Sequence, residues 1–219
     1  MEPNFWLERW GKGETGWHRD EVHPELVEQW PSLDLPPRSR VLVPLCGASL
    51  DMAWLAKQGH EVIGVELSQK ALEQFLTRHR VRHIVLNEGG FHAYHGGRYQ
   101  LWCGDLFALP ADVFASADAV YDRASLIALP PEMRTRYAAT LRDRLNPGTR
   151  ILLITVDYDP AEMSGPPFSV PDKEVRTLFQ DHFDITEIKT VDVLAENDGL
   201  RPRGLIALTE KTCILSRKA

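Results

Sequence analysis

The sequence predicts a single α/β domain with a doubly wound, mostly parallel sheet of seven strands, a terminal antiparallel strand and helices on both faces. Short apolar segments alternate with segments of amphipathic helical spacing between about residues 40 and 183, which is the pattern of a parallel sheet covered by helices. The chain has 219 residues and no repeat, a length that suits one core. Together these observations predict a Rossmann-like fold over residues 39–219, with a helical cover over residues 1–38.

The first half of the predicted sheet has the order strand, helix, strand, helix. Apolar runs rich in β-branched residues predict the strands, and apolar residues at helical spacing predict the helices. Gly59 is positioned to end the first helix, and Ser68 is positioned to cap the second. The predicted segments are strands at 40–45 and 61–67 and helices at 50–58 and 68–80.

The second half is less regular, because glycine pairs at 89–90 and 96–97 mark turns around an added strand. A turn at Asn146-Pro147-Gly148 precedes the most apolar strand, and two late segments alternate like the arms of an antiparallel pair. Residues 84–86 are a candidate for a further short strand. The other predicted strands are 99–103, 118–121, 149–156, 184–193 and 212–217, and the predicted helices are 130–145 and 171–183.

The predicted N-terminal cover carries four tryptophans. Trp6 and Trp30 are interpreted as packing residues of amphipathic helices. Trp10 and Trp17 flank the glycine-containing stretch 11–16, which is suited to closing over a bound ligand. We therefore expect the N-terminal segment to act as a lid.

Charge and composition exclude several classes of protein. The formal charge of −6 gives no positive field for nucleic acid, and no apolar run approaches the roughly 20 residues of a membrane helix. Acidic residues near the start argue against a signal peptide. Three widely spaced cysteines fit a reducing cytoplasm and argue against a disulfide framework. His92 and His95 lack a third ligand, so we expect no metal. With no long apolar edge or heptad seam visible, we also expect a monomer.

The residues that follow the predicted strands indicate a ligand site, because open parallel sheets bind ligands beyond the carboxyl ends of their strands. Gly47 follows the first strand and permits a ligand to approach the backbone. Glu66 ends the second strand, where a carboxylate can accept both hydroxyls of a ribose. Asp105 could accept from the adenine amine, and Leu106 could pack against the ring. Gly47 as a plain turn glycine, Glu66 as a solvated strand end and Asp105 as a capping residue are the structural alternatives.

The nature of the cofactor follows from what the first turn lacks. A pyrophosphate needs the repeated glycines of GxGxxG, and a triphosphate loop ends in Lys-Ser/Thr. The turn Leu45-Cys46-Gly47-Ala48-Ser49-Leu50-Asp51 has one glycine and no such ending. S-adenosylmethionine, an adenosine compound without phosphate, meets these demands.

Several segments, in this order along the chain, resemble the bacterial form of the thiopurine S-methyltransferase family. They are more specific than a general methyltransferase pattern. The segments that carry the resemblance are Pro44-Leu45-Cys46-Gly47, Gly59-His60 followed by Val65-Glu66-Leu67-Ser68, Tyr121-Asp122-Arg123-Ala124-Ser125-Leu126, and Tyr158-Asp159-Pro160 with Gly165-Pro166-Pro167-Phe168.

The resemblance implies roles for individual residues. The strand end of the family usually has the sequence Trp-Asp-Arg-Gly, whereas this chain has Tyr121-Asp122-Arg123-Ala124. Asp122 and Arg123 are the expected catalytic residues, and the alternative for Arg123 is an ion pair with Asp122 or Asp157. The expected cofactor contacts are Trp10, Leu45, Gly47, Glu66, Asp105, Leu106 and Arg123. The expected substrate contacts are Trp17, His18, Arg123, Phe168 and Arg203, with Arg201 as the alternative to Arg203.

The expected activity is transfer of the methyl group of S-adenosylmethionine to the sulfur of thiopurines and related aromatic or heterocyclic thiols, leaving S-adenosyl-L-homocysteine. Selenium or tellurium oxyanions are further candidate acceptors in a detoxifying role, because soft anions make the same demands. Two alternatives stay open: a cofactor-sensing module without turnover, and an NAD-dependent oxidoreductase, which the missing glycines oppose.

Overall fold

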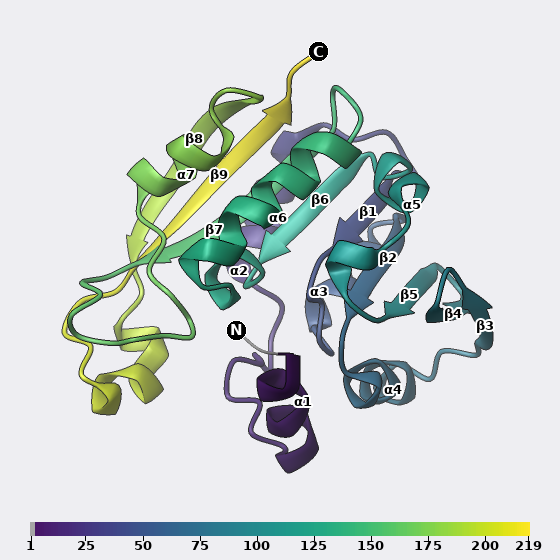
Figure 1. Cartoon of the computed structure of the whole chain (residues 1–219), viewed down its shortest axis with the longest axis horizontal. Helices are drawn as coiled ribbons and strands as arrows, with labels where there is room; N and C mark the ends of the chain where they lie inside the picture. The colour runs from purple at the N-terminus through teal and green to yellow at the C-terminus, as the bar shows by residue number, and fades with distance from the viewer. Residues whose placement is uncertain (1–2) are drawn as a thin grey trace. The chain divides into compact units, whose positions relative to one another are not determined.

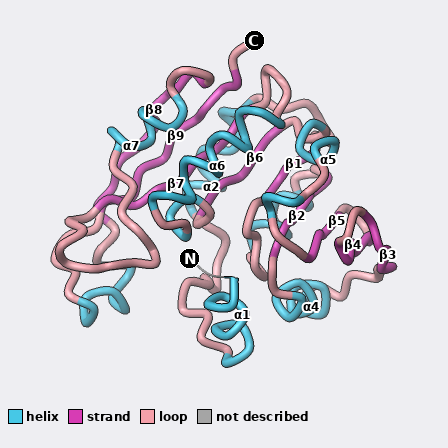
Figure 2. The backbone as a smooth tube through the Cα atoms, in the orientation of Figure 1, coloured by secondary structure: helices cyan, strands magenta, loops and turns pink. Residues whose placement is uncertain are grey.

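The computed structural model describes residues 3–219 and has an α/β, Rossmann-like architecture with a mixed sheet (Figures 1 and 2). The predicted α/β, Rossmann-like class is therefore confirmed. The first two residues of the predicted N-terminal cover lie outside the described residues. Two compact units make up the chain: the first is Met1–Tyr121 with Arg144–Asn146, and the second is Asp122–Asp143 with Pro147–Ala219.

The first unit contains strands in the order β3-β4-β5-β2-β1-β6, and the last two residues of β6, Asp122 and Arg123, belong to the second unit. Strand β1 pairs in parallel with β2 and with β6, and β2 pairs in parallel with β5. The hairpins β3-β4 and β4-β5 are antiparallel. The parallel strands end at one edge, as the site prediction requires. The bounds are β1 (Arg40–Val43), β2 (Glu61–Glu66), β3 (Ile84–Glu88), β4 (Phe91–Gly96), β5 (Tyr99–Cys103) and β6 (Ala119–Arg123).

The helices of the first unit begin where the sequence supplies capping groups. Ser49 Oγ accepts the N–H of Asp51, and Ser68 Oγ accepts the N–H of Ala71, as expected for N-caps. Gly59 has a φ of 96° just after the first of these helices, which confirms its predicted role. The elements are α1 (Pro3–Lys12), α2 (Pro24–Gln29), η1 (Trp30–Leu33), α3 (Leu50–Lys57), α4 (Gln69–Arg78), η2 (Leu106–Ala108) and α5 (Ala111–Ala115).

The second unit contains strands in the order β7-β9-β8, with antiparallel pairing throughout. Helix α7 packs beside β8 (Figure 1). The predicted antiparallel terminal pair is confirmed, and its strand β8 is irregular between Glu187 and Lys189. The elements are β7 (Arg150–Asp157), β8 (Phe183–Asp192), β9 (Thr209–Arg217), η3 (Leu126–Ala128), α6 (Pro131–Arg144), α7 (Asp172–Phe179) and η4 (Ala195–Arg203).

Two details of the predicted sheet are wrong. The described chain has nine strands instead of seven, and the sheet is mixed instead of mostly parallel. The candidate at 84–86 is the strand β3, and β4 lies between the two glycine pairs that were interpreted only as turns. Together they add an antiparallel hairpin beside β5.

The helices of residues 3–219 are all too short or too polar to serve as a membrane-spanning segment. The longest of them, α6, has 14 residues, against the roughly 20 that a bilayer core requires.

Candidate active site

The turn after β1 has a left-handed backbone and is hydrogen-bonded to the neighbouring strand, β2. Leu45 and Gly47 have φ angles of 46° and 53°, in the left-handed region that favours glycine. The N–H of Cys46 donates to the carbonyl oxygen of Val65 at 2.9 Å. The N–H of Gly47 donates to Glu66 Oε2 at 3.0 Å. The glycine turn and the acidic strand end, which sequence analysis paired only by position, therefore contact each other directly.

Glu66 is a buried carboxylate with a defined orientation at the end of β2. Its Oε1 accepts the N–H of Ser68 at 2.8 Å, while Oε2 accepts that of Gly47. Burial raises the pKa of the Glu66 carboxyl, and these backbone N–H donors act in the opposite direction. Each carboxylate oxygen also has a second lone pair that can accept a further hydrogen bond. Glu66 can therefore hold the turn and accept hydroxyl groups of a ligand at the same time.

The N-terminal cover lies directly on the glycine turn. A Cβ atom at Gly47 would lie 2.9 Å from His18 Nε2 and 3.2 Å from the ring of Trp10. His18 Nε2 also accepts the N–H of Ala48 at 3.4 Å. Trp10 is buried, and its ring stacks edge to face with His18 at 5.0 Å between centroids. No side chain fits at position 47 with the cover in this place.

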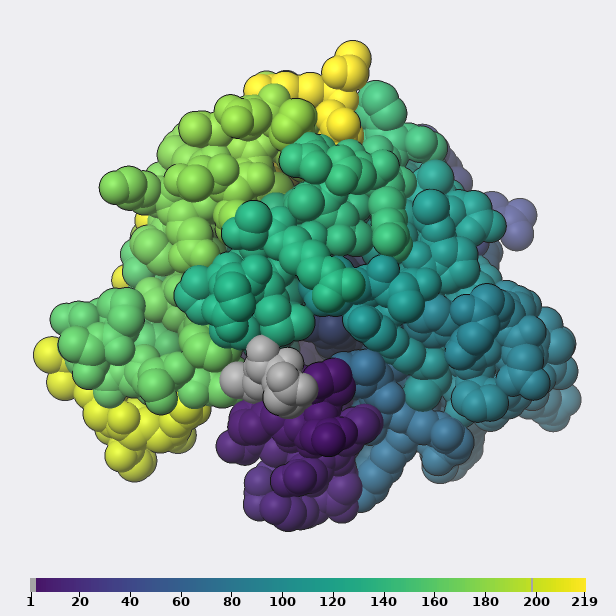
Figure 3. Space-filling view, in the orientation of Figure 1, coloured from purple at the N-terminus to yellow at the C-terminus, as the bar shows by residue number. Residues whose placement is uncertain are grey.

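Helix α4 supports the cover from the side. Lys70 Nζ donates to the carbonyl oxygen of Gly11 at 3.0 Å, and Figure 3 shows the purple atoms of the N-terminal segment against the blue atoms of this region. Trp17 contacts Trp10 and Trp6 edge to face. The structure therefore groups Trp10, Trp17 and His18 in one aromatic cluster.

The segment after β5 completes this edge of the sheet. The N–H of Gly104 donates to the backbone carbonyl of Glu66 at 2.9 Å, so the ends of β2 and β5 are adjacent. Asp105 Oδ1 accepts the N–H of Phe107 at 3.0 Å, which caps η2, while the Asp105 residue remains exposed. Leu106 is buried. The first unit thus brings together all the predicted cofactor contacts except Arg123, which belongs to the second unit.

Asp122 is buried, and both oxygens of its carboxylate are engaged. Oδ2 accepts the hydroxyl of Tyr137 at 2.6 Å, and Oδ1 accepts the N–H groups of Ser125 and Leu126 at 3.2 and 3.3 Å. Burial raises the pKa of Asp122 and that of the Tyr137 hydroxyl. These contacts hold the loop after β6 and favour a positioning role for Asp122. Tyr137 was not found by sequence analysis.

Arg123 is the last residue of β6 and is half-buried. It forms an ion pair with neither Asp122 nor Asp157, the two carboxylates that the sequence offered as partners. Asp122 accepts the Tyr137 hydroxyl instead, and Asp157 Oδ1 lies 3.0 Å from Ser169 Oγ. The alternative role of Arg123 as the ion-pair partner of Asp122 or Asp157 is therefore not what the described chain shows.

Ala124 has a φ of 78°, a conformation that costs an L-residue about 1–2 kcal/mol. We expect Ala124→Gly to raise the free energy of unfolding by roughly 1 kcal/mol, because the relief of strain exceeds the added freedom of the unfolded chain. Urea denaturation of both proteins measures this change. Ala139→Gly, in the middle of α6, serves as the control and should destabilise by a similar amount. Equal destabilisation at both positions would contradict the expectation.

A proline-rich segment carries Phe168 in the second unit. The Phe168 N–H donates to the carbonyl oxygen of Ile127 at 2.7 Å, and the Tyr158 hydroxyl donates to that of Pro167 at 2.6 Å. Arg203 Nη1 donates to the carbonyl oxygen of Pro166 at 2.9 Å. The side chain of Arg203, one of the two arginines named as candidates, therefore contacts this segment.

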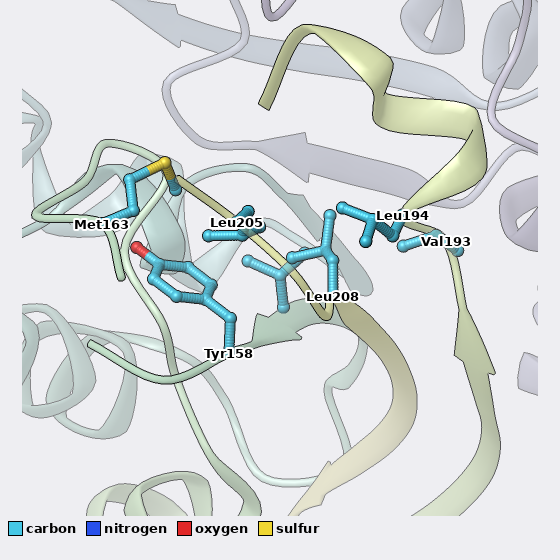
Figure 4. Close-up of a cluster of buried hydrophobic side chains, with 7 residues drawn as sticks. Tyr158, Met163, Val193, Leu194, Leu205 and Leu208 are labelled. Atoms are coloured by element: carbon cyan, nitrogen blue, oxygen red, sulfur yellow. The ribbon is translucent and has the colours of Figure 1, made fainter. Parts of the chain in front are cut away.

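A cluster of buried apolar side chains packs the chain around Tyr158 and Met163 against residues on either side of η4 (Figure 4). Tyr158 and Met163 lie on one side of Leu205 in the view, and Leu194 and Val193 lie on the other. The cluster consists of Val156, Tyr158, Met163, Val193, Leu194, Leu205 and Leu208.

Arg134 is a buried residue that sequence analysis missed. Its Nη1 lies 2.7 Å from both carboxylate oxygens of Glu174, and its Nε donates to the carbonyl oxygen of Leu129 at 2.8 Å. The guanidinium carbon lies 5.6 Å from the centroid of the Phe168 ring. Arg134 shares the buried face of α6 with Tyr137 and Leu141, and a cation at a core position of a helix is the signal that could have revealed it.

Comparison with known proteins gives a match over nearly the whole chain. The family model described as thiopurine S-methyltransferase matches residues 1–218. Proteins named thiopurine S-methyltransferase from Pseudomonas entomophila and Azotobacter vinelandii are each 48% identical to this chain. The first alignment covers 99% of this chain and 100% of that protein, and the second covers 100% of both.

Solved structures of methyltransferases share the fold. One is a 1,6-didemethyltoxoflavin-N1-methyltransferase of Burkholderia thailandensis with bound S-adenosylhomocysteine. Its alignment with this chain has a TM-score of 0.65 and 18% sequence identity, and covers 99% of this chain and 87% of that one. The alignment with a SAM-dependent methyltransferase of Anabaena variabilis has a TM-score of 0.68 and 15% sequence identity, and covers 99% of this chain and 95% of that one.

Proposed function

Because the chain belongs to the thiopurine S-methyltransferase family and is an S-adenosylmethionine-dependent methyltransferase, we propose that it methylates the sulfur of thiopurines and of related aromatic or heterocyclic thiols. The observation that carries the cofactor side of this proposal is the hydrogen bond between Glu66 Oε2 and the N–H of Gly47. It places a buried acceptor beside the turn that follows the first parallel strand, where ligands of such sheets bind.

The residues of the first unit fit an adenosine compound without phosphate. Glu66 keeps acceptor positions for ribose hydroxyls, and Asp105 Oδ2 is the candidate acceptor for the adenine amine, beside the apolar Leu106. Trp10 covers the turn at Gly47 and excludes water from it. The turn supplies no series of glycine N–H groups for a pyrophosphate.

When bound, S-adenosylmethionine supplies a methyl group on a sulfonium, which a thiolate takes by in-line displacement. Aromatic and heterocyclic thiols are more acidic than an alkyl thiol with its pKa of about 8.5, so the chain does not need a general base. We propose that Arg123 and Arg203 hold the acceptor anion by charge-assisted hydrogen bonds. Phe168, Trp17 and His18 are the proposed contacts with its ring.

The free state of Cys46, Cys103 and Cys213 supports the proposal that the enzyme works in the reducing cytoplasm. All three lie in the described chain without a disulfide. Burial raises the pKa of each of these thiols, which makes them poor nucleophiles and leaves the acceptor thiol as the reacting sulfur.

A labelled-methyl assay tests the proposal. We expect transfer from S-adenosylmethionine to 6-mercaptopurine and thiophenol, with parallel reactions on selenite and tellurite to test the oxyanions. Arg123→Ala should lower kcat/KM about tenfold through loss of a charge-assisted hydrogen bond of roughly 1.5 kcal/mol, and Arg123→Lys should retain more activity.

The matched control is Arg136→Ala, which removes an exposed arginine of α6 and should leave kcat/KM unchanged. Tight binding of S-adenosylhomocysteine together with no product from any of these acceptors would overturn the proposed activity. Equal losses in Arg123→Ala and Arg136→Ala would overturn the role of Arg123.

A further inference from the structure

The carbonyl groups at the C-terminal end of α1 accept hydrogen bonds from two parts of the chain. Carbonyl groups in the last turn of a helix have no partner within the helix and need one from outside it. Those of Arg9 and Trp10 accept N–H groups of the turn that follows, at 2.9 and 3.3 Å. That of Gly11 accepts a side chain instead, Lys70 Nζ, at 3.0 Å. Lys70 comes from α4, which lies beside α1 in the same unit (Figure 1).

Lys70 occupies a position where a cation does not favour its own helix. It is the second residue of α4, and the positive end of the helix dipole disfavours a cation there. Glu73, three positions later, accepts the side-chain amide of Gln69 at 2.8 Å. At the C-terminal end of α1 the same ammonium meets the negative end of a dipole, where a cation is favoured. The position of Lys70 therefore indicates a role in holding α1 and not in forming α4.

Both sides of this contact lie within a few residues of the proposed cofactor site. The residue before the accepting carbonyl group is Trp10, whose ring would lie 3.2 Å from a Cβ atom at Gly47. On the other side, Ser68 comes two residues before Lys70, and its N–H donates to Glu66 Oε1 at 2.8 Å. The contact therefore connects the side chain that covers the turn with the segment that orients the proposed ribose acceptor.

We propose that Lys70 is a positioning residue for the cofactor, which acts by holding Trp10 over the turn at Gly47. The inference rests on the proposed cofactor site. With the contact in place, the cover stays closed and S-adenosylhomocysteine leaves slowly. Without it, α1 loses one of its attachments and the cover opens more often. Lys70 takes no part in the methyl transfer, so the rate of that step should not depend on it.

A second attachment of the cover limits the size of the effect. His18 Nε2 accepts the N–H of Ala48 at 3.4 Å, and this contact does not involve Lys70. Loss of one exposed cation at a helix C-terminus should therefore raise the dissociation rate of S-adenosylhomocysteine about fivefold.

Stopped-flow tryptophan fluorescence of the full chain tests the inference. We expect Lys70→Met to raise the dissociation rate and the Kd of S-adenosylhomocysteine about fivefold. Lys70→Arg should restore the native rate, because a guanidinium can also donate to the Gly11 carbonyl group. The matched control is Lys57→Met, which removes an exposed lysine at the end of α3 and should leave the rate unchanged.

Two further readouts separate positioning from a general loss of structure. In the free protein, the amides of Gly13 and Glu14 close the end of α1, and they should exchange faster in Lys70→Met than in the native chain. With 6-mercaptopurine as acceptor, Lys70→Met should raise the KM for S-adenosylmethionine. Its single-turnover rate at saturating S-adenosylmethionine should stay native.

A native dissociation rate in Lys70→Met would overturn the inference. An equal rise in Lys57→Met, or a Lys70→Arg variant that behaves like Lys70→Met, would overturn it as well. The binding measurements do not depend on the methyl acceptor. A chain that shows the expected dissociation rates but methylates no thiol would overturn the proposed function and leave the role of Lys70 in place.

Discussion

Glu66→Gln is expected to weaken the binding of S-adenosylmethionine about 100-fold in titration calorimetry. The native carboxylate accepts the N–H groups of Gly47 and Ser68 and is the proposed acceptor of the ribose hydroxyls. Glutamine has the same shape but one acceptor oxygen, so its amide would turn an N–H toward one of these backbone donors. Hydrogen bonds to a charged group contribute about 1.5–3 kcal/mol each, which accounts for the expected size.

The same carboxyl should make cofactor affinity depend on pH. Burial raises the pKa of Glu66 in the folded chain. As the pH falls through that raised pKa, the carboxyl gains a proton and loses acceptor capacity. We therefore expect the affinity of the native protein to fall with the pH in this range, while the affinity of Glu66→Gln stays flat.

Glu61→Gln is the matched control for this experiment. Glu61 begins β2, the strand that Glu66 ends, and Glu61 Oε1 accepts a hydrogen bond from Arg98 at 3.1 Å. Its replacement should leave cofactor affinity unchanged. Native affinity in Glu66→Gln would show that the ribose is held elsewhere.

Arg134→Ala is expected to lower the free energy of unfolding by about 3 kcal/mol. Breaking a buried ion pair leaves a charge without its partner and costs about 3–5 kcal/mol. The lower end applies because the Glu174 side chain is 28% exposed. The carbonyl oxygen of Leu129 also loses its donor. Urea denaturation measures the change.

The activity of Arg134 variants separates positioning from stability. The guanidinium lies over the ring of Phe168, so we expect a raised KM for the thiol acceptor with unchanged affinity for S-adenosylmethionine. The double variant Arg134→Met/Glu174→Leu leaves no unpaired charge and should recover most of the stability, while KM stays raised. A KM that returns to the native value in the double variant would mean that Arg134 acts only through folding.

Most of the helices and strands around the site could be predicted from the sequence, because their apolar patterns and capping residues match the secondary structure that they adopt. The strands before Gly47 and Glu66 are continuous apolar runs, and Ser68 caps the next helix as expected. Strand β4 could not be found in the same way, because its two histidines and its flanking glycines hide the alternation. Helix α5 has only 5 residues, which is less than two turns of periodicity.

The candidate site was predicted where one rule, that ligands bind at the carboxyl ends of parallel strands, brings distant residues together. That rule placed Gly47 beside Glu66. No comparable rule pairs Asp122 with Tyr137, or Arg134 with Glu174, which are 15 and 40 positions apart. These pairs arise from the packing of α6, and packing partners leave no spacing pattern in the sequence.

The division of the chain into a part that precedes Asp122 and a part that carries Phe168 matters for directed evolution. Apart from Arg123, the residues proposed to bind the adenosyl group precede Asp122 in the sequence. The proline-rich segment and the residues on either side of η4 pack in a separate apolar cluster. Libraries that randomise exposed positions of 159–168 and 195–204 should therefore yield variants with new acceptor ranges that still bind S-adenosylhomocysteine as tightly as the parent.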